Sequence, residues 1–433
     1  MSNQQTAIVS ANGIEITDGS GRVLIDLAAA MASSLGHRDA AVVDAILQAA
    51  GANLGSGFDS VGPSDLRSLG EPFDSFAAIA ITPSVSEANE RAIRIARQAG
   101  QLRDAGSGDG GTGDRYRIIT LLGGDHGDTL ACRSAGGRID DQAALLPLAA
   151  GFRHVAPGDA RALEKAIDAQ TIAILLAPVD WTRGGEPFAA EYLRQIRKIC
   201  DERGLLLIVD ETRLPVAISG KWFFHQAADI SADIVTASAG WTGGLPGGLI
   251  FVADSAHAAA IHGSAAIDRG DSLQNESSGD DDAGGASEFG FKVQFCGRST
   301  MPIGETDYPL LRAVIATTAG KIVASGGPGQ IADAATRWDE AWQAFVDGFE
   351  FVSGCMTVGL WAVTRFDLPV GEVRSAAEKH GLRWIQSSDT TLLACLPILD
   401  SAIGGKGLSS TSEELVQKLR LTLETIERQT IES

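Results

Sequence analysis

Two short apolar runs restrict the fold of this chain more than any other feature. Residues 205–209 and 234–236 are rich in branched side chains and are bounded by Gly, Asp and Ser, a pattern typical of strands buried on both faces of a sheet. The first run ends at Asp210, and the second leads to Ala239 and a glycine-rich turn. Because ligands of open parallel sheets bind at the carboxyl ends of the strands, we expect any chemistry at these two places.

Length and charge exclude several classes of protein. At 433 residues the chain is too long for one ordinary core, which predicts a large domain with a smaller companion. A net charge of −20 argues against nucleic-acid partners. No apolar run approaches the roughly 18 residues that span a bilayer, and the first residues lack the basic and apolar regions of a signal peptide. We therefore expect no membrane association and a cytoplasmic location.

The sequence predicts neither disulfides nor a metal site. The five cysteines are widely spaced and never form a CxxC pair, which favours reduced thiols in a cytosolic protein. The acidic residues 280–282 are adjacent, without the alternating ligands and closing glutamate of a calcium loop.

A helix is predicted to begin near Ser84. Ser84 and Glu87 have the spacing of a capping box, and apolar residues then recur on one helical face over residues 88–96. A helix N-terminus can hold an anion such as phosphate. A capped helix without other signals is nevertheless more often structural than ligand-binding.

The order of these features resembles the class III aminotransferases, closest to the acetylornithine and ornithine aminotransferases. These enzymes use pyridoxal phosphate on the fold-type I scaffold of PLP-dependent transferases. In that family one strand ends in Asp-Glu, whose Asp holds the proton on the pyridine nitrogen, and another ends in the Schiff-base lysine before a glycine-rich turn. Asp210, Glu211 and the turn at residues 243–248 match.

The resemblance extends to the helix start and to a His-Gly dipeptide. The family segment Ser-Gly-Ala-Glu-Ala-Asn holds the cofactor phosphate, and here Val85 and Ser86 replace its Gly-Ala. The family also has an aromatic residue that stacks on the pyridine, followed by His-Gly, where this chain has Asp125 and His126. The resemblance thus implies five cofactor-binding positions: Asp210, Val85, Ser86, Asp125 and His126.

Four positions depart from the family at the residues that carry its chemistry. Ala239 stands in place of the lysine, and Asp125 in place of the aromatic ring. Ala177 replaces the first residue of the family's Glu-Pro-Ile-Gln. Ala394 falls where an arginine clamps the substrate carboxylate. We therefore expect no catalytic residue at these places and no covalently held cofactor.

Three explanations of the missing lysine compete. An engineered substitution would have left the other family residues intact, and they are absent too. Lys221 or Lys292 would take the role only with a shifted alignment, and neither ends a strand beside a glycine turn. The remaining hypothesis is a degenerate, acetylornithine aminotransferase-like pseudoenzyme without normal transaminase activity. The alternative is an active aminotransferase, or another PLP-type enzyme, that uses a different residue.

The resemblance also implies an architecture and partners. We expect an α/β fold, with a large domain over residues 51–315 around a mostly parallel, seven-stranded sheet, and a smaller α/β domain from residues 1–50 and 316–433. The polar segments 104–114 and 268–288 are expected to be flexible loops. A family threonine that contacts the phosphate across the dimer would fall near Gly304. The expected partners are a second copy in a homodimer and a small amino-acid-like or anionic ligand. The expected cofactor is non-covalent pyridoxal phosphate, or none.

Overall fold

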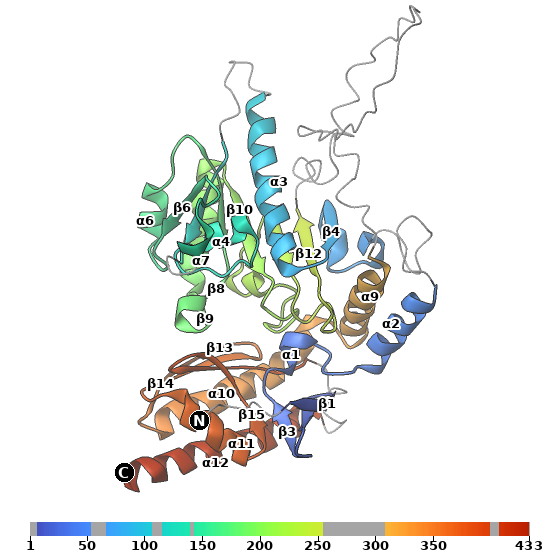
Figure 1. The fold of residues 1–433 in the computed structure, drawn as a ribbon, viewed down its shortest axis with the longest axis vertical. Coiled ribbons are helices and arrows are strands. Elements are labelled where there is room, and N and C mark those ends of the chain that lie inside the picture. The colour runs from blue at the N-terminus through green and yellow to red at the C-terminus, as the bar shows by residue number, and fades with distance from the viewer. Residues whose placement is uncertain are drawn as a thin grey trace, which may run out of the picture.

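A seven-stranded sheet forms the centre of the larger part of the molecule (Figure 1). The computed structural model describes residues 7–52, 66–105, 115–138, 143–253, 308–398 and 407–432. The predicted loops at 106–114 and 268–288, Lys292 and Gly304 lie outside these ranges, whereas residues 104–105 belong to a helix.

The order of strands in this sheet is that of a doubly wound fold. From edge to edge the strands are β4 (Ala78–Thr82), β12 (Gly248–Val252), β11 (Ile234–Ala237), β10 (Leu206–Glu211), β7 (Thr171–Leu176), β5 (Arg117–Leu121) and β6 (Phe152–Val155). Within it, β12 runs antiparallel to β11 and β4, while the pairs β11–β10, β10–β7, β7–β5 and β5–β6 are parallel. The two apolar runs that predicted buried strands are β10 and β11, and both are buried throughout.

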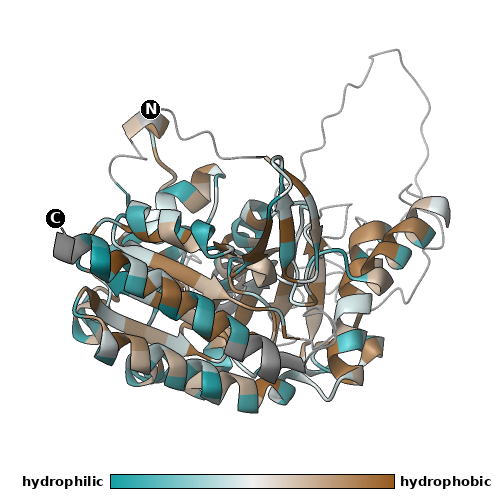
Figure 2. Cartoon of the chain, turned by 90° about the horizontal axis from the view of Figure 1, so that it is seen from below, coloured by the Kyte–Doolittle hydropathy of each residue, from teal (hydrophilic) through white to brown (hydrophobic). Residues whose placement is uncertain are grey.

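Helices cover this sheet. They are α3 (Val85–Ala105), α4 (Leu130–Gly136), α6 (Ala160–Lys165) and α7 (Ala190–Arg203), with α2 (Ala40–Ala52) and α9 (Pro309–Ala324) packed on each other at one end. Seen from below, in Figure 2, the helices near the C-terminus carry both hydrophilic and hydrophobic stretches and lie in front of largely hydrophobic strands. The predicted cap of α3 is present, since the Ser84 hydroxyl accepts a hydrogen bond from the Glu87 amide at 3.2 Å. A small hairpin of β8 (Val179–Asp180) and β9 (Glu186–Pro187) follows β7.

The smaller part combines both ends of the chain. One sheet has the order β1 (Ile8–Asn12), β2 (Glu15–Asp18), β3 (Val23–Asp26) and β15 (Leu382–Arg383), and the other has β13 (Val352–Val358), β14 (Trp361–Phe366), β17 (Thr391–Cys395) and β16 (Ile385–Ser388). Four helices accompany them: α1 (Ala29–Ala32), α10 (Ala332–Gly348), α11 (Val370–Lys379) and α12 (Gly407–Glu432). The N-terminal β3 and the C-terminal β15 pair in parallel.

The predicted fold class is confirmed: the structure is α/β, with a large, mostly parallel sheet flanked by helices. The division at residues 50 and 315 stays a prediction. In the described ranges, no helix is long and apolar enough to cross a membrane. Those same ranges contain no group of three or more His, Cys, Asp or Glu side chains placed to hold a metal ion.

Candidate active site

The two predicted ligand-binding places lie side by side at one edge of the sheet. Strands β10 and β11 are paired in parallel, with Asp210 opposite Thr236. Two residues beyond β11, Ala239 is held by its amide, which donates to the Thr212 carbonyl at 3.0 Å, and by its carbonyl, which accepts from the Val216 amide at 3.1 Å. Its side chain is a methyl group, and the residue is 8% exposed. The position that the resemblance assigns to the Schiff-base lysine therefore carries no amine.

Asp210 is enclosed by protein donors on both carboxylate oxygens. Oδ2 accepts from the Asn89 side-chain amide at 2.9 Å and from Nδ1 of His126 at 2.7 Å. Oδ1 accepts from the amide and the hydroxyl of Thr212 at 2.9 and 2.7 Å. A carboxylate has about four acceptor sites, and these four donors fill them. Asp210 is only 4% exposed.

The carboxylate of Asp210 is ionised in this environment. Burial opposes its ionisation, but the hydrogen bonds from His126 and Thr212, together with the charge of His126, hold its pKa below the ordinary value. The proton shared with His126 therefore belongs to Nδ1 of the imidazole, which donates to Asp210.

Asn89 connects α3 to both strands. Its amide nitrogen also donates to the His126 carbonyl at 2.8 Å, and its amide oxygen accepts from the Thr236 hydroxyl at 2.6 Å. Asn89 is the last residue of the segment 84–89, which the resemblance aligns with the family's phosphate-binding Ser-Gly-Ala-Glu-Ala-Asn, but here its side chain holds Asp210. Thr236 and Thr212 were not singled out from the sequence. An aspartate two residues before a threonine is a local signal for the Thr212 contact, because Asp side chains often accept from the amide two residues on.

Glu211 has a structural role. Its Oε1 accepts from the His225 amide at 2.8 Å and lies 2.6 Å from Nδ1 of that ring, while its Oε2 accepts from the Phe224 amide at 2.7 Å. These contacts satisfy the start of the short helix Phe224–Ala228.

Asp125 forms an ion pair where the resemblance places a stacking aromatic ring. Its carboxylate binds the guanidinium of Arg213, which in turn lies over the ring of Trp181, 4.7 Å from the ring centroid. Both partners were missed in the sequence because they are distant in the chain. At this position the protein presents a paired carboxylate instead of a flat apolar face.

Val85 and Ser86 lie at the start of α3, as predicted. The Ser86 hydroxyl accepts from the Asp128 amide at 2.9 Å, and a Cβ at Gly127 would approach within 2.5 Å of that hydroxyl. Glu87 lies in the first helical turn, so a carboxylate is present where the helix dipole favours negative charge. Whether Val85 and Ser86 bind phosphate stays a prediction.

The place assigned to the substrate clamp carries an alanine. Ala394 is fully buried within β17. Arg365, which lies on the neighbouring strand β14 opposite Thr391, is paired with Glu186 at 3.1 Å, and Arg183 is paired with the same carboxylate at 2.7 Å. Ala177 at the end of β7 is likewise buried and offers no carboxylate.

His37 makes both a backbone and a side-chain contact within the N-terminal segment. Its backbone pairs with Gly13, but its Nε2 also lies 3.0 Å from the buried carboxylate of Asp26. Arg383 donates to the other oxygen of Asp26 at 3.0 Å. Arg383 therefore joins the C-terminal part of the chain to Asp26, and His37 holds the same carboxylate from the N-terminal segment.

The residues present do not fit pyridoxal phosphate bound in the manner that the resemblance implies. Asp210 has no acceptor site left for a pyridinium N–H, Ala239 offers no amine for the aldehyde, and Asp125 offers no stacking face. Binding at this place would require the donors around Asp210 to rearrange.

Comparisons with known proteins agree with the fold. Residues 1–268 match the family Aminotransferase class-III. The acetylornithine aminotransferase of Brucella melitensis is 37% identical over 259 residues, which are 58% of this chain and 62% of that protein. The chain therefore spans less than two thirds of the length of this curated relative.

Two solved structures resemble the whole chain. The N-acetylornithine aminotransferase of Stenotrophomonas maltophilia has a TM-score of 0.71 at 22% identity, covering 99% of this chain and 98% of that one. An amine transaminase from an uncultivated Pseudomonas species, in a PLP-bound internal aldimine form, has a TM-score of 0.73 at 21% identity, with 98% and 95% coverage. At these identities the likeness shows the fold alone. With the family match extending through the Asp210 and Ala239 positions and over more than half of the chain, this protein belongs to the class III aminotransferases, a family whose cofactor is pyridoxal phosphate.

Proposed function

We propose that this chain is an acetylornithine aminotransferase-like pseudoenzyme, which keeps the scaffold of the class III aminotransferases without their normal transaminase activity. The observation that carries the proposal is the buried methyl group of Ala239 beyond β11, beside the filled carboxylate of Asp210. Any cofactor is held without a covalent bond.

The missing amine matters because transamination needs a group that holds the aldehyde and moves a proton. A positioned general acid or base typically contributes roughly 100-fold to 10,000-fold in rate. Of the lysines considered as substitutes, Lys221 is exposed in the segment after β10, and Lys292 lies outside the described residues. The paired state of Arg183 and Arg365 further supports the loss of carboxylate recognition.

Titration with pyridoxal phosphate, followed by borohydride reduction and peptide mass spectrometry, tests the proposal. We expect no lysine of the native chain to carry a stoichiometric pyridoxyl group, and no amino transfer from acetylornithine. A single modified lysine with accompanying amino transfer would instead establish the alternative, an active enzyme that uses a different residue.

Ala239→Lys provides the matched control. If only the lysine were missing, this variant would form a stable aldimine at residue 239. We expect it to form none at stoichiometric cofactor, because Asp210 and Asp125 remain engaged. The homodimer and the cytoplasmic location stay predictions, and light scattering coupled to size-exclusion chromatography tests the first.

A further inference from the structure

The ion pair of Asp125 and Arg213 joins the ends of two strands that are not neighbours in the sheet. Asp125 follows β5 and Arg213 follows β10, while β7 lies between these strands and runs parallel to both. Trp181 follows β7 and the short strand β8, and the Arg213 guanidinium lies over its ring, 4.7 Å from the centroid. One side chain therefore connects the carboxyl ends of three parallel strands, at the edge where ligands of such sheets bind.

This ion pair lies on the solvent side of the hydrogen bonds around Asp210. Asp125 immediately precedes His126, whose Nδ1 lies 2.7 Å from Oδ2 of Asp210. Arg213 immediately follows Thr212, which donates to Oδ1. His126 and Thr212 are buried, whereas the side chains of Asp125 and Arg213 are 34% and 47% exposed. Each of the two loops thus contacts the buried carboxylate with one residue and the other loop with the next.

The contacts of Arg213 are individually weak. A half-exposed ion pair contributes little to stability because water and salt screen it. A cation–π contact at an exposed site adds a similar, small amount. The two contacts together favour the closed arrangement by about 3-fold to 30-fold over one in which Arg213 points into solvent. The ion pair can therefore open without unfolding the chain.

Backbone hydrogen bonds keep both loops in place when the ion pair opens. The carbonyl of His126 accepts from the Asn89 side chain at 2.8 Å, and the carbonyl of Thr212 accepts from the Ala239 amide at 3.0 Å. These bonds do not involve Asp125 or the guanidinium. We therefore expect substitutions in the ion pair to change access to the edge of the sheet while the fold is kept.

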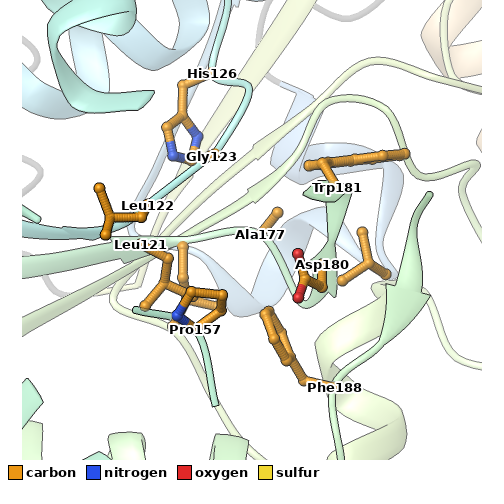
Figure 3. Close-up of a pocket in the computed structure, with 12 residues that line it drawn as sticks. Leu121, Leu122, Gly123, His126, Pro157, Ala177, Asp180, Trp181 and Phe188 are labelled. Carbon is orange, nitrogen blue, oxygen red and sulfur yellow. The ribbon is translucent and has the colours of Figure 1, made fainter. Parts of the chain in front are cut away.

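We propose that Asp125 and Arg213 form an autoinhibitory clasp, which closes this edge of the sheet and keeps ligands with a protonated ring nitrogen from Asp210. Trp181 supports the clasp from the side of a small pocket whose lining it shares with His126 (Figure 3). The resemblance places a flat aromatic ring at residue 125, so the aspartate there both removes a stacking face and supplies the closing contact. The inference rests on the function proposed above, since it explains how the chain excludes a cofactor from Asp210.

Equilibrium dialysis of the full chain with deoxypyridoxine phosphate tests the clasp. This probe keeps the ring nitrogen and the phosphate, but it has no aldehyde and forms no Schiff base. Its binding is therefore independent of whether a native lysine reacts with pyridoxal phosphate. We expect Asp125→Asn and Arg213→Gln each to bind the probe about 3-fold to 30-fold more tightly than the natural chain, because both open the clasp.

The pair of variants separates the clasp from a simple effect of charge. The probe is an anion, so charge alone would strengthen its binding to Asp125→Asn and weaken its binding to Arg213→Gln. The double variant of Asp125→Asn with Arg213→Gln has no net change of charge and should still bind more tightly than the natural chain. Unchanged or weaker binding in the folded double variant, including no detectable binding in any protein, would overturn the proposal.

Two control variants are matched to these substitutions. Arg203→Gln breaks an ion pair of similar exposure, with Glu164 at 2.7 Å, and Asp44→Asn removes a charge at an exposed position on α2. Both should bind as the natural chain does, and circular dichroism verifies folding of every variant. If the clasp variants fail to fold, the natural chain decides: its affinity for pyridoxine, which carries no phosphate, should rise with sodium chloride as the ion pair is screened, and no rise would overturn the proposal.

Discussion

Replacing Asp210 by Asn removes the charge at the centre of the candidate site with almost no change in shape. The natural carboxylate accepts two hydrogen bonds on each oxygen. An asparagine keeps one oxygen and turns an NH₂ group toward two former donors. The new amide can face either pair of donors. His126 can change tautomer and the Thr212 hydroxyl can rotate, so in each orientation of the asparagine one donor of the pair still faces the NH₂ group without an acceptor. That donor is the side chain of Asn89 or the amide of Thr212.

The expected loss of stability follows from this single donor without an acceptor. One buried donor without a partner costs about 1–3 kcal/mol, and the loss of charge assistance in the remaining bonds adds about 1 kcal/mol. The relief of a buried charge offsets part of this sum. We therefore expect Asp210→Asn to lower the free energy of unfolding by about 2–4 kcal/mol near pH 7.

The pH dependence gives a second, independent measurement. Because folding lowers the pKa of Asp210 from the ordinary 3.8, its stabilisation is fully present above 3.8 and is lost as the pH falls through the lower folded-state value. Asp18 and Asp26 also have lowered pKa values, but both are present in the two proteins and cancel in the difference.

Urea unfolding followed by fluorescence, at a series of pH values from about 7 to 3, measures both quantities. The difference between the natural chain and Asp210→Asn should be constant at neutral pH and shrink in acid. Asp44→Asn should differ from the natural chain by no more than about 0.5 kcal/mol. A difference at Asp210 below about 1 kcal/mol, or one that grows in acid, would refute the fully hydrogen-bonded carboxylate described above.

Three further changes test other parts of the structure. Thr236→Val leaves the Asn89 side-chain oxygen without its donor and should lower the free energy of unfolding, measured in urea, by about 1–3 kcal/mol. Thr318→Val removes a buried hydroxyl that has no described partner and should leave the free energy of unfolding unchanged. Equal effects of the two substitutions would contradict the hydrogen bonds described around Asn89. Burial raises the pKa of Cys132 to about 12, so mass spectrometry should find it unmodified by iodoacetamide in the native chain near pH 8 and modified in urea; rapid native labelling would show that it is exposed. Gly240→Ala should lower the melting temperature more than Gly158→Ala. Both glycines have a positive φ, but only at residue 240 would the new Cβ lie within 3 Å of other atoms. A larger decrease for Gly158→Ala would contradict the packing described for the turn at Gly240.

Much of the sheet could be predicted because buried parallel strands have a strong sequence signature. Residues 205–209 and 234–236 contain branched apolar side chains between turn residues, and they became β10 and β11. The cap of α3 was equally local, since Ser84 and Glu87 are three residues apart. The place of Asp210 at the end of its strand followed from the same pattern.

The state of the candidate site could not be predicted, because it depends on contacts between distant segments. Asp210 meets Asn89 and His126 across separations of 121 and 84 residues, and neither contact has a periodic or spacing signal. The pairing of Asp125 with Arg213 is similarly remote. The sequence could identify the substitution at residue 239, but only the structure relates it to a carboxylate whose acceptor sites are already filled.

The pairing of β3 with β15 has a consequence for how the chain is made. Asp26 receives its bond from Arg383, which follows it by 357 residues. At typical ribosomal speeds of 5–20 residues per second, the N-terminal strands wait about 20–70 s for this partner to emerge. During that interval the edge of β3 has no strand to pair with, and an unpaired edge invites association with other chains. We therefore expect this edge of β3 to be open to association with other chains until synthesis is almost complete.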